Sequence, residues 1–463
     1  MSDSPRPTRN LATLLVVSIA LFMTVLDNLV VTVALPSIRL DLGASVQSLE
    51  WTVNAYVLSY AVLLLTGAAL GDRFGRRRMF ILGLGLFTLA SAAAAVAPNT
   101  GLLIATRAVQ GAGAAVVTPL TLTLLAAAFP TERRGMALGI WSGISGMAVA
   151  IGPLVGGGVI ESLSWHWIFW INVPIGLVLI PVAARVLRES VGPFDRLDLP
   201  GLAMASGGLF GLVFGLVRAQ SLGWGNPTVL VSLAVGLLLV GAFVAWERRT
   251  PMPMLPMGFF ARRAFAVTNV VSLTMYFGMF GSIFFMTQFF QTVLGYSALE
   301  AGLRMLTWTG ATMLVAPIAG VLSERLGSRP FMVAGLTLQG AALAWIASVA
   351  STTLPFSDVV IPFVMAGAGM ALVFAPSANA VLSSVRTDQA GQASGANNAI
   401  REVGGVFGIA VLATVFSGAG SYASHPAFVN GFRSALWVGA GVLAVGAVVT
   451  VAFPFGQRRP AGA

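Results

Sequence analysis

An acidic residue stands inside the first long apolar run of the chain. The run starts at Leu11, and the stretch FMTVLDNLVVTVALP, residues 22–36, carries Asp27 near its middle. An ionised carboxylate at the centre of a bilayer costs roughly 2.5–3.5 kcal/mol on insertion scales, so it is a functional candidate by default. The chemistry open to such a group is the uptake and release of a proton, which its surroundings control.

One basic residue, Arg107, lies within another apolar run, ATRAVQGAGAAVVTPLTLT. At 1.5 Å per residue, Asp27 lies about 12 Å and Arg107 about 9 Å below the same expected membrane surface. We therefore expect both charges to face one cavity. Burial favours the neutral carboxylate and the arginine favours the charged one, so the proton affinity would change with geometry. A static salt bridge that pins the two spans is the alternative.

Other polar and aromatic residues within the spans are candidate substrate contacts. Asn28 follows the acid, and Gln110 lies on a polar stripe of its predicted helix. A phenylalanine-rich run contributes Phe280 and Phe284, with Gln288 one turn further on. Aromatic faces suit greasy, planar or cationic molecules. The alternative is that these phenylalanines face lipid.

Two loops share an acid, an arginine and a glycine. The loops read ALGDRFGRRR and VLSERLGSRP, so residues 72–75 align with 324–327. The glycine permits a tight turn, and the acid can accept hydrogen bonds from an arginine or a helix end. Such contacts would bias a two-state equilibrium if one conformation alone makes them. A basic loop that only fixes topology is the alternative. The predicted gating loop comprises Asp72, Arg73, Gly75, Arg76 and Arg77.

The stretch AIGPLVGGGV, in a further apolar run, combines a proline with glycines. Pro153 removes a backbone donor and bends a helix. Gly152, Gly156 and Gly157 allow close helix packing. We expect this segment to flex.

The elements that must position these residues are membrane spans. Hydrophobic residues make up 57% of the 463 residues and charged residues 9%, whereas a soluble domain carries about 25% charged residues. Such a chain can cover its surface only where that surface faces lipid, so we predict an all-α polytopic membrane protein. Fourteen spans are expected, near 11–35, 49–70, 79–97, 101–123, 136–160, 167–187, 199–217, 228–246, 264–291, 301–323, 331–349, 359–384, 395–416 and 433–454.

The distribution of basic residues orients these spans. All 26 basic residues are arginines, of which 21 lie at one set of span ends, four at the other and one within a span. The positive-inside rule then places both termini in the cytoplasm and accounts for the net charge of +10 without a nucleic-acid partner.

The paired loops suggest two repeats of six spans separated by an insert. We predict an N-terminal six-helix bundle (1–187), two inserted helices with linkers (188–259) and a C-terminal six-helix bundle (260–463). The chain has no cysteine and two histidines, His166 and His425, which suit neither a metal cluster nor a catalytic pair. We therefore expect no metal and no cofactor. No cluster of nucleophile, base and orienting group is found, so an enzyme is not expected.

These motifs together resemble the major facilitator superfamily, specifically its fourteen-span branch of drug:proton antiporters. The resemblance extends from Leu26 to Gly408. It departs from the usual glycine at Ala68 in the loop motif and at Ala148 in the glycine-rich motif. The stretches that carry it are LDNLVVTVALP, LGDRFGRRR, RAVQGAGAA, GPLVGG, WHWIFWINVPIG and GQASGANNAIREVGGVFG.

The resemblance implies proton-driven efflux of drugs, antibiotics, dyes or secondary metabolites by alternating access. It associates proton coupling with Arg107, gating with the loop motif and antiport with the motif at 152–157. We expect Asp27 to exchange the proton and Arg107 to tune its proton affinity. The expected partners are protons, a small-molecule substrate and the bilayer of the plasma membrane, in which the chain is expected to be a monomer. An uncoupled facilitator or importer of a specific metabolite is one alternative, and a non-transporting membrane sensor is another.

The remaining acids lead to one further expectation. Apart from Asp27, every acid is expected near the end of a span, Glu402 included. A cationic substrate and the proton would then compete for one carboxylate.

Overall fold

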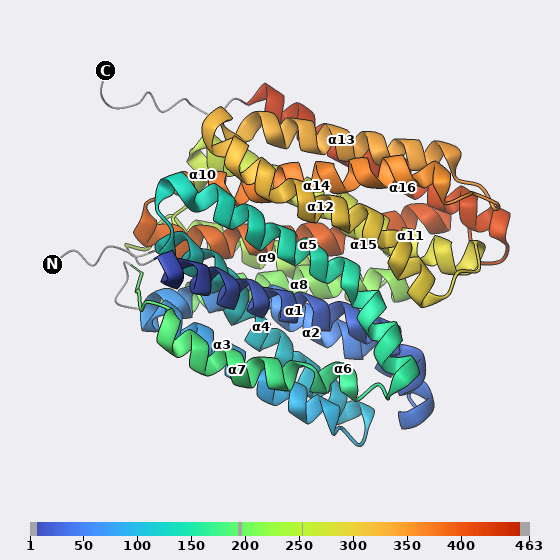
Figure 1. Cartoon of the computed structure of the whole chain (residues 1–463), viewed down its shortest axis with the longest axis horizontal. Coiled ribbons are helices and arrows are strands. Elements are labelled where there is room, and N and C mark those ends of the chain that lie inside the picture. The colour runs from blue at the N-terminus through green and yellow to red at the C-terminus, as the bar shows by residue number, and fades with distance from the viewer. Residues whose placement is uncertain (1–6, 193–196, 252, 454–463) are drawn as a thin grey trace.

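The computed structural model describes residues 7–192, 197–251 and 253–453, and every regular element in that part of the chain is helical. The helices lie side by side along the long axis of the molecule (Figure 1). Helix α1 (Pro7–Leu42) begins at the same end of the bundle at which α16 (His425–Ala452) stops. The predicted all-helical membrane fold is confirmed.

The helices fall into three consecutive stretches of chain. The first continues after α1 with α2 (Val46–Phe74), α3 (Arg76–Ala95), α4 (Thr100–Ala128), α5 (Thr131–Ser162), α6 (Trp167–Trp170) and α7 (Asn172–Val186). The second contains α8 (Leu199–Leu222) and α9 (Pro227–Glu247). The third, which ends with α16, contains α10 (Gly258–Ala261), α11 (Arg263–Gln288), η1 (Phe289–Val293), α12 (Ala298–Leu326), α13 (Ser328–Val349), α14 (Ser357–Ser383), η2 (Thr387–Gln389) and α15 (Ala390–Ala419).

Thirteen helical segments among the described residues are long and apolar enough to cross a membrane. They coincide with thirteen of the fourteen predicted spans. The other predicted span, near 136–160, lies within α5, a 32-residue helix that is not among these thirteen. The number fourteen therefore stays a prediction.

Side-chain caps and glycines set the ends of several helices. Asn99 accepts a hydrogen bond of 2.9 Å from the backbone N–H of Leu102 at the start of α4, and Ser297 forms a capping box at the start of α12. Gly75 and Gly327 adopt φ values of +105° and +83°, a conformation that favours glycine. These two glycines join α2 to α3 and α12 to α13, the positions that the sequence repeat pairs.

Close contacts join the first and third stretches toward the end of the bundle at which α1 begins. A Cβ atom at Gly139 of α5 would lie 2.6 Å from the Cα atom of Pro317 in α12, so these helices touch backbone to backbone. A Cβ atom at Gly395 of α15 would lie 2.7 Å from the Cβ of Ala68 in α2. Farther along α5, Gly152 packs on α1 instead, so the α5–α12 interface belongs to one end of the molecule.

Helices α8 and α9 pack on each other through glycines. A Cβ atom at Gly211 would lie 2.8 Å from the Cα of Gly236. Helix α8 also contacts α2 and α15. In the most apolar stretch of α9, by contrast, only 17% of the residues are buried. Helix α9 is therefore peripheral, and α8 connects it to the rest of the bundle.

Candidate functional site

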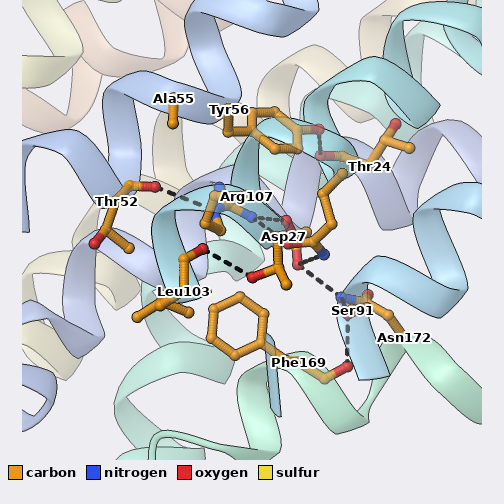
Figure 2. Close-up of polar contacts among 12 residues, drawn as sticks. Thr24, Asp27, Thr52, Ala55, Tyr56, Ser91, Leu103, Arg107, Phe169 and Asn172 are labelled. Carbon is orange, nitrogen blue, oxygen red and sulfur yellow. Dashed lines mark hydrogen bonds and ion pairs between the residues drawn. The ribbon is translucent and has the colours of Figure 1, made fainter. Parts of the chain in front are cut away.

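The structure brings Asp27 of α1 and Arg107 of α4 into a buried ion pair. Both side chains are completely inaccessible to solvent. The Arg107 guanidinium donates to the Asp27 carboxylate, to Oε1 of Gln110 (3.0 Å) and to the backbone carbonyl of Thr52 (3.2 Å). It also lies 4.3 Å from the ring centroid of Tyr56, within cation–π range (Figure 2). Helices α1, α2 and α4 thus meet at this pair.

Two amide side chains complete the shell around Asp27. Oδ1 of Asp27 accepts a hydrogen bond of 2.7 Å from Asn172 and one of 3.2 Å from Gln110. Asn172 also donates to Ser91 of α3, at 3.0 Å (Figure 2). The sequence reasoning missed Asn172. The one available signal was an amide within the apolar stretch WINVP.

The arrangement can couple a proton to helix movement. Protonation of Asp27 would neutralise the carboxylate and leave the Arg107 charge buried without its counter-ion, an arrangement that costs about 3–5 kcal/mol. The Nη2 atom of Arg107 already lacks a hydrogen-bond partner. Relief requires α1 and α4 to shift relative to each other, which is the behaviour expected of a coupling site.

The predicted gating loop is centred on a second buried pair, Asp72–Arg76, at 2.8 Å with both side chains 4% exposed. Arg76 also donates to the Asp388 carbonyl at 3.1 Å, and Gly391 packs directly on the Asp72 carboxylate. The loop therefore fastens the end of α2 to the start of α15.

The other two arginines of the loop, Arg73 and Arg77, lie closer to solvent. Glu189 accepts hydrogen bonds from the backbone N–H groups of Arg77 and Arg78 and is 3.7 Å from the Arg77 guanidinium. A Cβ atom at Gly75 would come within 2.8 Å of the Glu189 carboxyl group. Arg73 is exposed, with its guanidinium 5.7 Å from the Phe74 ring. Glu189 is a further partner that the sequence reasoning did not single out.

The second copy of the loop makes an equivalent contact. Glu324 of α12 accepts a hydrogen bond from the backbone N–H of Gly135, in the first turns of α5. Each acid thus contacts the beginning of another helix: Asp72 of α2 contacts α15, and Glu324 of α12 contacts α5. The two fastenings lie at the same end of the bundle.

The glycine-rich segment of α5 packs on α1 next to the buried acid. A Cβ atom at Gly152 would lie 2.8 Å from the Cβ of Leu29, and one at Gly156 would lie 3.2 Å from the Cβ of Val33. Gly157 has open space beside it. The side chain of Pro153 lies outside the described residues.

The candidate substrate contacts do not form one cluster. Gln110 is fully buried in the shell of Asp27, and Asn28 is partly buried with Oδ1 unpaired. Phe284 is 39% exposed, whereas Phe280 packs on Tyr276 with a ring distance of 5.4 Å. The set is therefore divided between the Asp27 shell, the bundle surface and an aromatic group on α11.

Gln288, the last of these candidates, is engaged near the other end of the bundle. It accepts a hydrogen bond of 2.6 Å from the Tyr422 hydroxyl. Burial raises the pKa of Tyr422, and the bond to Gln288 acts in the opposite direction.

A second pair of embedded charges corrects the sequence analysis. Glu402, expected near a span end, lies well inside the 30-residue helix α15, and so does Arg401, which was counted among the cytoplasmic arginines. Arg401 is 2% exposed. The predicted span began at 395, whereas α15 begins at Ala390, so both residues lie five positions deeper in the helix than expected. Asp27 is therefore not the single acid deep within a span.

An apolar cavity of about 380 Å³ lies between α2, α8, α9, α11 and α15. Its walls include Leu65, Phe243 and Val403, with Arg248 beside them. None of the predicted site residues lines it. Within the described part of the chain, no group of three or more His, Cys, Asp or Glu residues is placed to hold a metal ion.

Comparison with known proteins identifies the family to which this architecture belongs. The sequence profile of the Major Facilitator Superfamily matches residues 17–198, 199–409 and 270–463. The cephamycin export protein CmcT of Amycolatopsis lactamdurans is 39% identical over 450 residues, which cover 95% of this chain and 92% of that protein. The puromycin resistance protein of Streptomyces alboniger is 34% identical over 452 residues, covering 94% and 90%.

Solved structures share the fold at low sequence identity. The proton:xylose symporter XylE superposes with a TM-score of 0.70 at 14% identity, covering 96% of each chain. The human organic anion transporter MFSD10 gives a TM-score of 0.69 at 14% identity, covering 96% of this chain and all of that one. The profile and the relatives span most of the sequence, so this chain belongs to the Major Facilitator Superfamily and is a multi-pass membrane transporter of small molecules rather than an enzyme.

Proposed function

We propose that this transporter exports amphiphilic small molecules, antibiotics among them, in exchange for protons. The observation that carries the proposal is the sealed Asp27–Arg107 pair within the membrane. Its relatives named for cephamycin export, puromycin resistance and methylenomycin A resistance support antibiotics as cargo.

In the proposed cycle Asp27 carries the exchanged proton. The deprotonated carboxylate accepts the hydrogen bonds from Arg107, Gln110 and Asn172 that the structure contains. Protonation weakens each of these bonds, because the neutral acid is a poorer acceptor. The α1–α4 contact then loosens, and the glycine contacts of α5 on α1 let that movement reach α5.

Gating is assigned to the two fastenings at the end of the bundle where α1 begins. Asp72 with Arg76 holds α2 on α15, and Glu324 holds α12 on α5. The arginine distribution supports a cytoplasmic position for this end, and so for both termini. The conformation described here is then closed to the cytoplasm, and opening it must break both fastenings.

We further propose the plasma membrane as the location and a monomer as the working unit, built from the two six-helix bundles (1–187 and 260–463) with residues 188–259 as the insert. The peripheral position of α9 agrees with an insert added to a complete bundle.

The test uses inside-out vesicles with an imposed proton gradient and puromycin as cargo. Wild type is expected to accumulate puromycin in the vesicles, and Asp27→Asn to abolish accumulation although it reaches the membrane. Asp41→Asn is the matched control, because the exposed Asp41 is bonded to Trp165 outside the pair. Equal puromycin accumulation by wild type and Asp27→Asn would refute the proposal.

One observation favours a second candidate, an uncoupled facilitator. Asp27 is bonded at both oxygens and fully buried, which also suits a static pin between α1 and α4. In that case a collapsed gradient would leave the rate of puromycin flux unchanged.

A further inference from the structure

The apolar cavity lies where the insert meets the two bundles. Its walls come from α2 of the first stretch, α8 and α9 of the second, and α11 and α15 of the third, so all three stretches of chain border it. Its volume of about 380 Å³ falls in the usual range of ligand pockets. Arg248 is the one polar side chain that the described residues contribute to its lining. A buried water needs about two to four polar partners, so the fitting occupant is apolar.

The cavity lies at the end of the bundle that the gating loop closes. The linker after α9 forms part of its wall through Leu255 and Met257. This linker is fastened to the start of α15, because Gln392 donates a hydrogen bond of 3.4 Å to the Pro253 carbonyl. The proposed orientation places that end in the cytoplasm, so the cavity belongs to the cytoplasmic half of the membrane.

The depth of the cavity matches one membrane leaflet. Leu273 and Val403, two of its lining residues, follow the first residues of α11 and α15 by ten and thirteen positions. At 1.5 Å per residue these positions lie about 15 and 20 Å from the helix ends. One leaflet contributes about 15 Å of the apolar core of a bilayer. The cavity therefore has a suitable length for one acyl chain.

The cavity opens at the level of the helix ends. Arg248 and Phe260 are its exposed lining residues, and the ring of Phe260 is 37% exposed. The other lining residues are buried or half-buried. An acyl chain that enters here leaves its headgroup beside Arg248.

This opening is rich in positive charge. Arg248 and Arg249 directly follow α9, and Arg262 and Arg263 stand where α11 begins, all four exposed. Within the part of the chain that the structure describes, none of the four forms an ion pair. Arg262 donates to the Ser384 carbonyl, whereas the guanidinium of Arg248 has no partner among those residues.

The acids of α8 and α9 are engaged elsewhere. Asp198 caps α8 and accepts hydrogen bonds of 2.9 and 3.0 Å from the Trp246 indole. Glu247 is 3% exposed and accepts a hydrogen bond of 2.9 Å from the backbone N–H of Leu255. The charge that the opening presents to a ligand is therefore positive.

An apolar chain with an anionic head satisfies both features. Arginine binds phosphate oxygens through charge-assisted, often bidentate hydrogen bonds. Basic pockets between helices on the cytoplasmic side of a membrane suit anionic lipid headgroups. A phospholipid of the surrounding bilayer supplies the chain and the phosphate in one molecule.

We propose that this cavity binds one anionic phospholipid of the cytoplasmic leaflet, with an acyl chain among α2, α9 and α15 and the phosphate at Arg248. The lipid then contacts the peripheral helix α9 and the two helices that the Asp72–Arg76 pair holds together, so it ties the insert to both bundles. Such a lipid is neither cargo nor proton carrier, and its binding does not depend on the proposed export.

The experiment is native mass spectrometry of the purified full-length chain, which counts the lipid molecules that stay bound. Dioleoyl phosphatidylglycerol and dioleoyl phosphatidylcholine have the same chains and differ in net headgroup charge. Wild type is expected to retain one phosphatidylglycerol in preference to phosphatidylcholine. Arg248→Gln should lower that preference about fivefold, which converts to about 1 kcal/mol. Val244→Trp, which fills part of the cavity, should lower the retention of both lipids.

Two changes outside the cavity are the matched controls. Arg185→Gln removes an exposed arginine from the last turn of α7, and Leu238→Trp enlarges a side chain of α9 that is 72% exposed. Both should retain phosphatidylglycerol as wild type does. An equal loss in either control would indicate lipid bound loosely at the surface and would overturn the proposal.

Three further results would also overturn it. They are wild type without a preferred lipid, an unchanged preference in Arg248→Gln, and displacement of the lipid by puromycin, which would assign the cavity to cargo. Melting temperatures measured in parallel identify a variant that fails to fold. If Val244→Trp fails to fold, Arg248→Gln still decides, because Arg248 is exposed and has no partner to lose among the described residues.

Discussion

The buried pair Asp72–Arg76 offers a direct test of gating. Replacement of Asp72 by asparagine keeps the size of the side chain and removes its charge. Loss of one partner from a buried ion pair costs about 3–5 kcal/mol. Arg76 keeps its bond to the Asp388 carbonyl, and asparagine keeps an acceptor oxygen. We therefore expect the closed conformation to lose about 2 kcal/mol of stability relative to the open one. That energy corresponds to a roughly 30-fold change in the ratio of closed to open conformations.

The chain contains no cysteine, so spin labels can be attached at chosen sites without background. Cysteines at Phe74 of α2 and Ser383 of α14, both exposed, would report on the end of the bundle that the gating loop closes. Double electron–electron resonance should show a short distance between the two labels in the protein with Asp72 and a longer one in Asp72→Asn.

The control change lies in the neighbouring loop. Asp388→Asn removes the exposed ion pair of Asp388 with Arg386 but leaves the backbone carbonyl that Arg76 uses. An exposed pair contributes about 0–1 kcal/mol, so this variant should resemble wild type. The same distance distribution in Asp72→Asn and wild type would refute the gating role.

Three more changes test other contacts. Gly139→Leu should force α5 and α12 apart, because a Cβ atom there already comes within 2.6 Å of the Pro317 Cα, and labels across this interface should report a longer distance. Asn172→Leu should lower the free energy of unfolding by about 1–3 kcal/mol by leaving Oδ1 of Asp27 under-bonded, and an unchanged melting temperature would contradict this. Ser297→Ala should lower it by about 0.5–2 kcal/mol through loss of the α12 cap, with puromycin accumulation per folded protein unchanged.

The sequence was sufficient to pair Asp27 with Arg107, because charge is so costly in a bilayer that two isolated opposite charges at one depth are expected to meet. Asp72 and Arg76 could also be paired from the sequence, because they are four residues apart and meet across the tight α2–α3 connection that Gly75 makes possible. Span positions also followed from hydropathy, because lipid demands continuous apolar helices.

Other features depend on tertiary contacts that no local pattern contains. Asn172 is one amide among many in the spans, and only the arrangement of α1, α3 and α7 turns it toward Asp27. The start of α15 could not be placed from composition, because the predicted span begins at 395 whereas the helix begins at Ala390. Asn397 also pairs with Asn269 and Ser272 of α11, a contact that no local pattern predicts. The earlier start places Glu402 twelve positions inside the helix.

The central claim is that Asp27 carries the proton exchanged for cargo. The most direct measurement is proton release from purified protein in weakly buffered solution when puromycin is added, scanned across pH. Wild type is predicted to release protons over a limited pH range, and Asp27→Asn to release none at any pH. The same release from both proteins would contradict the account.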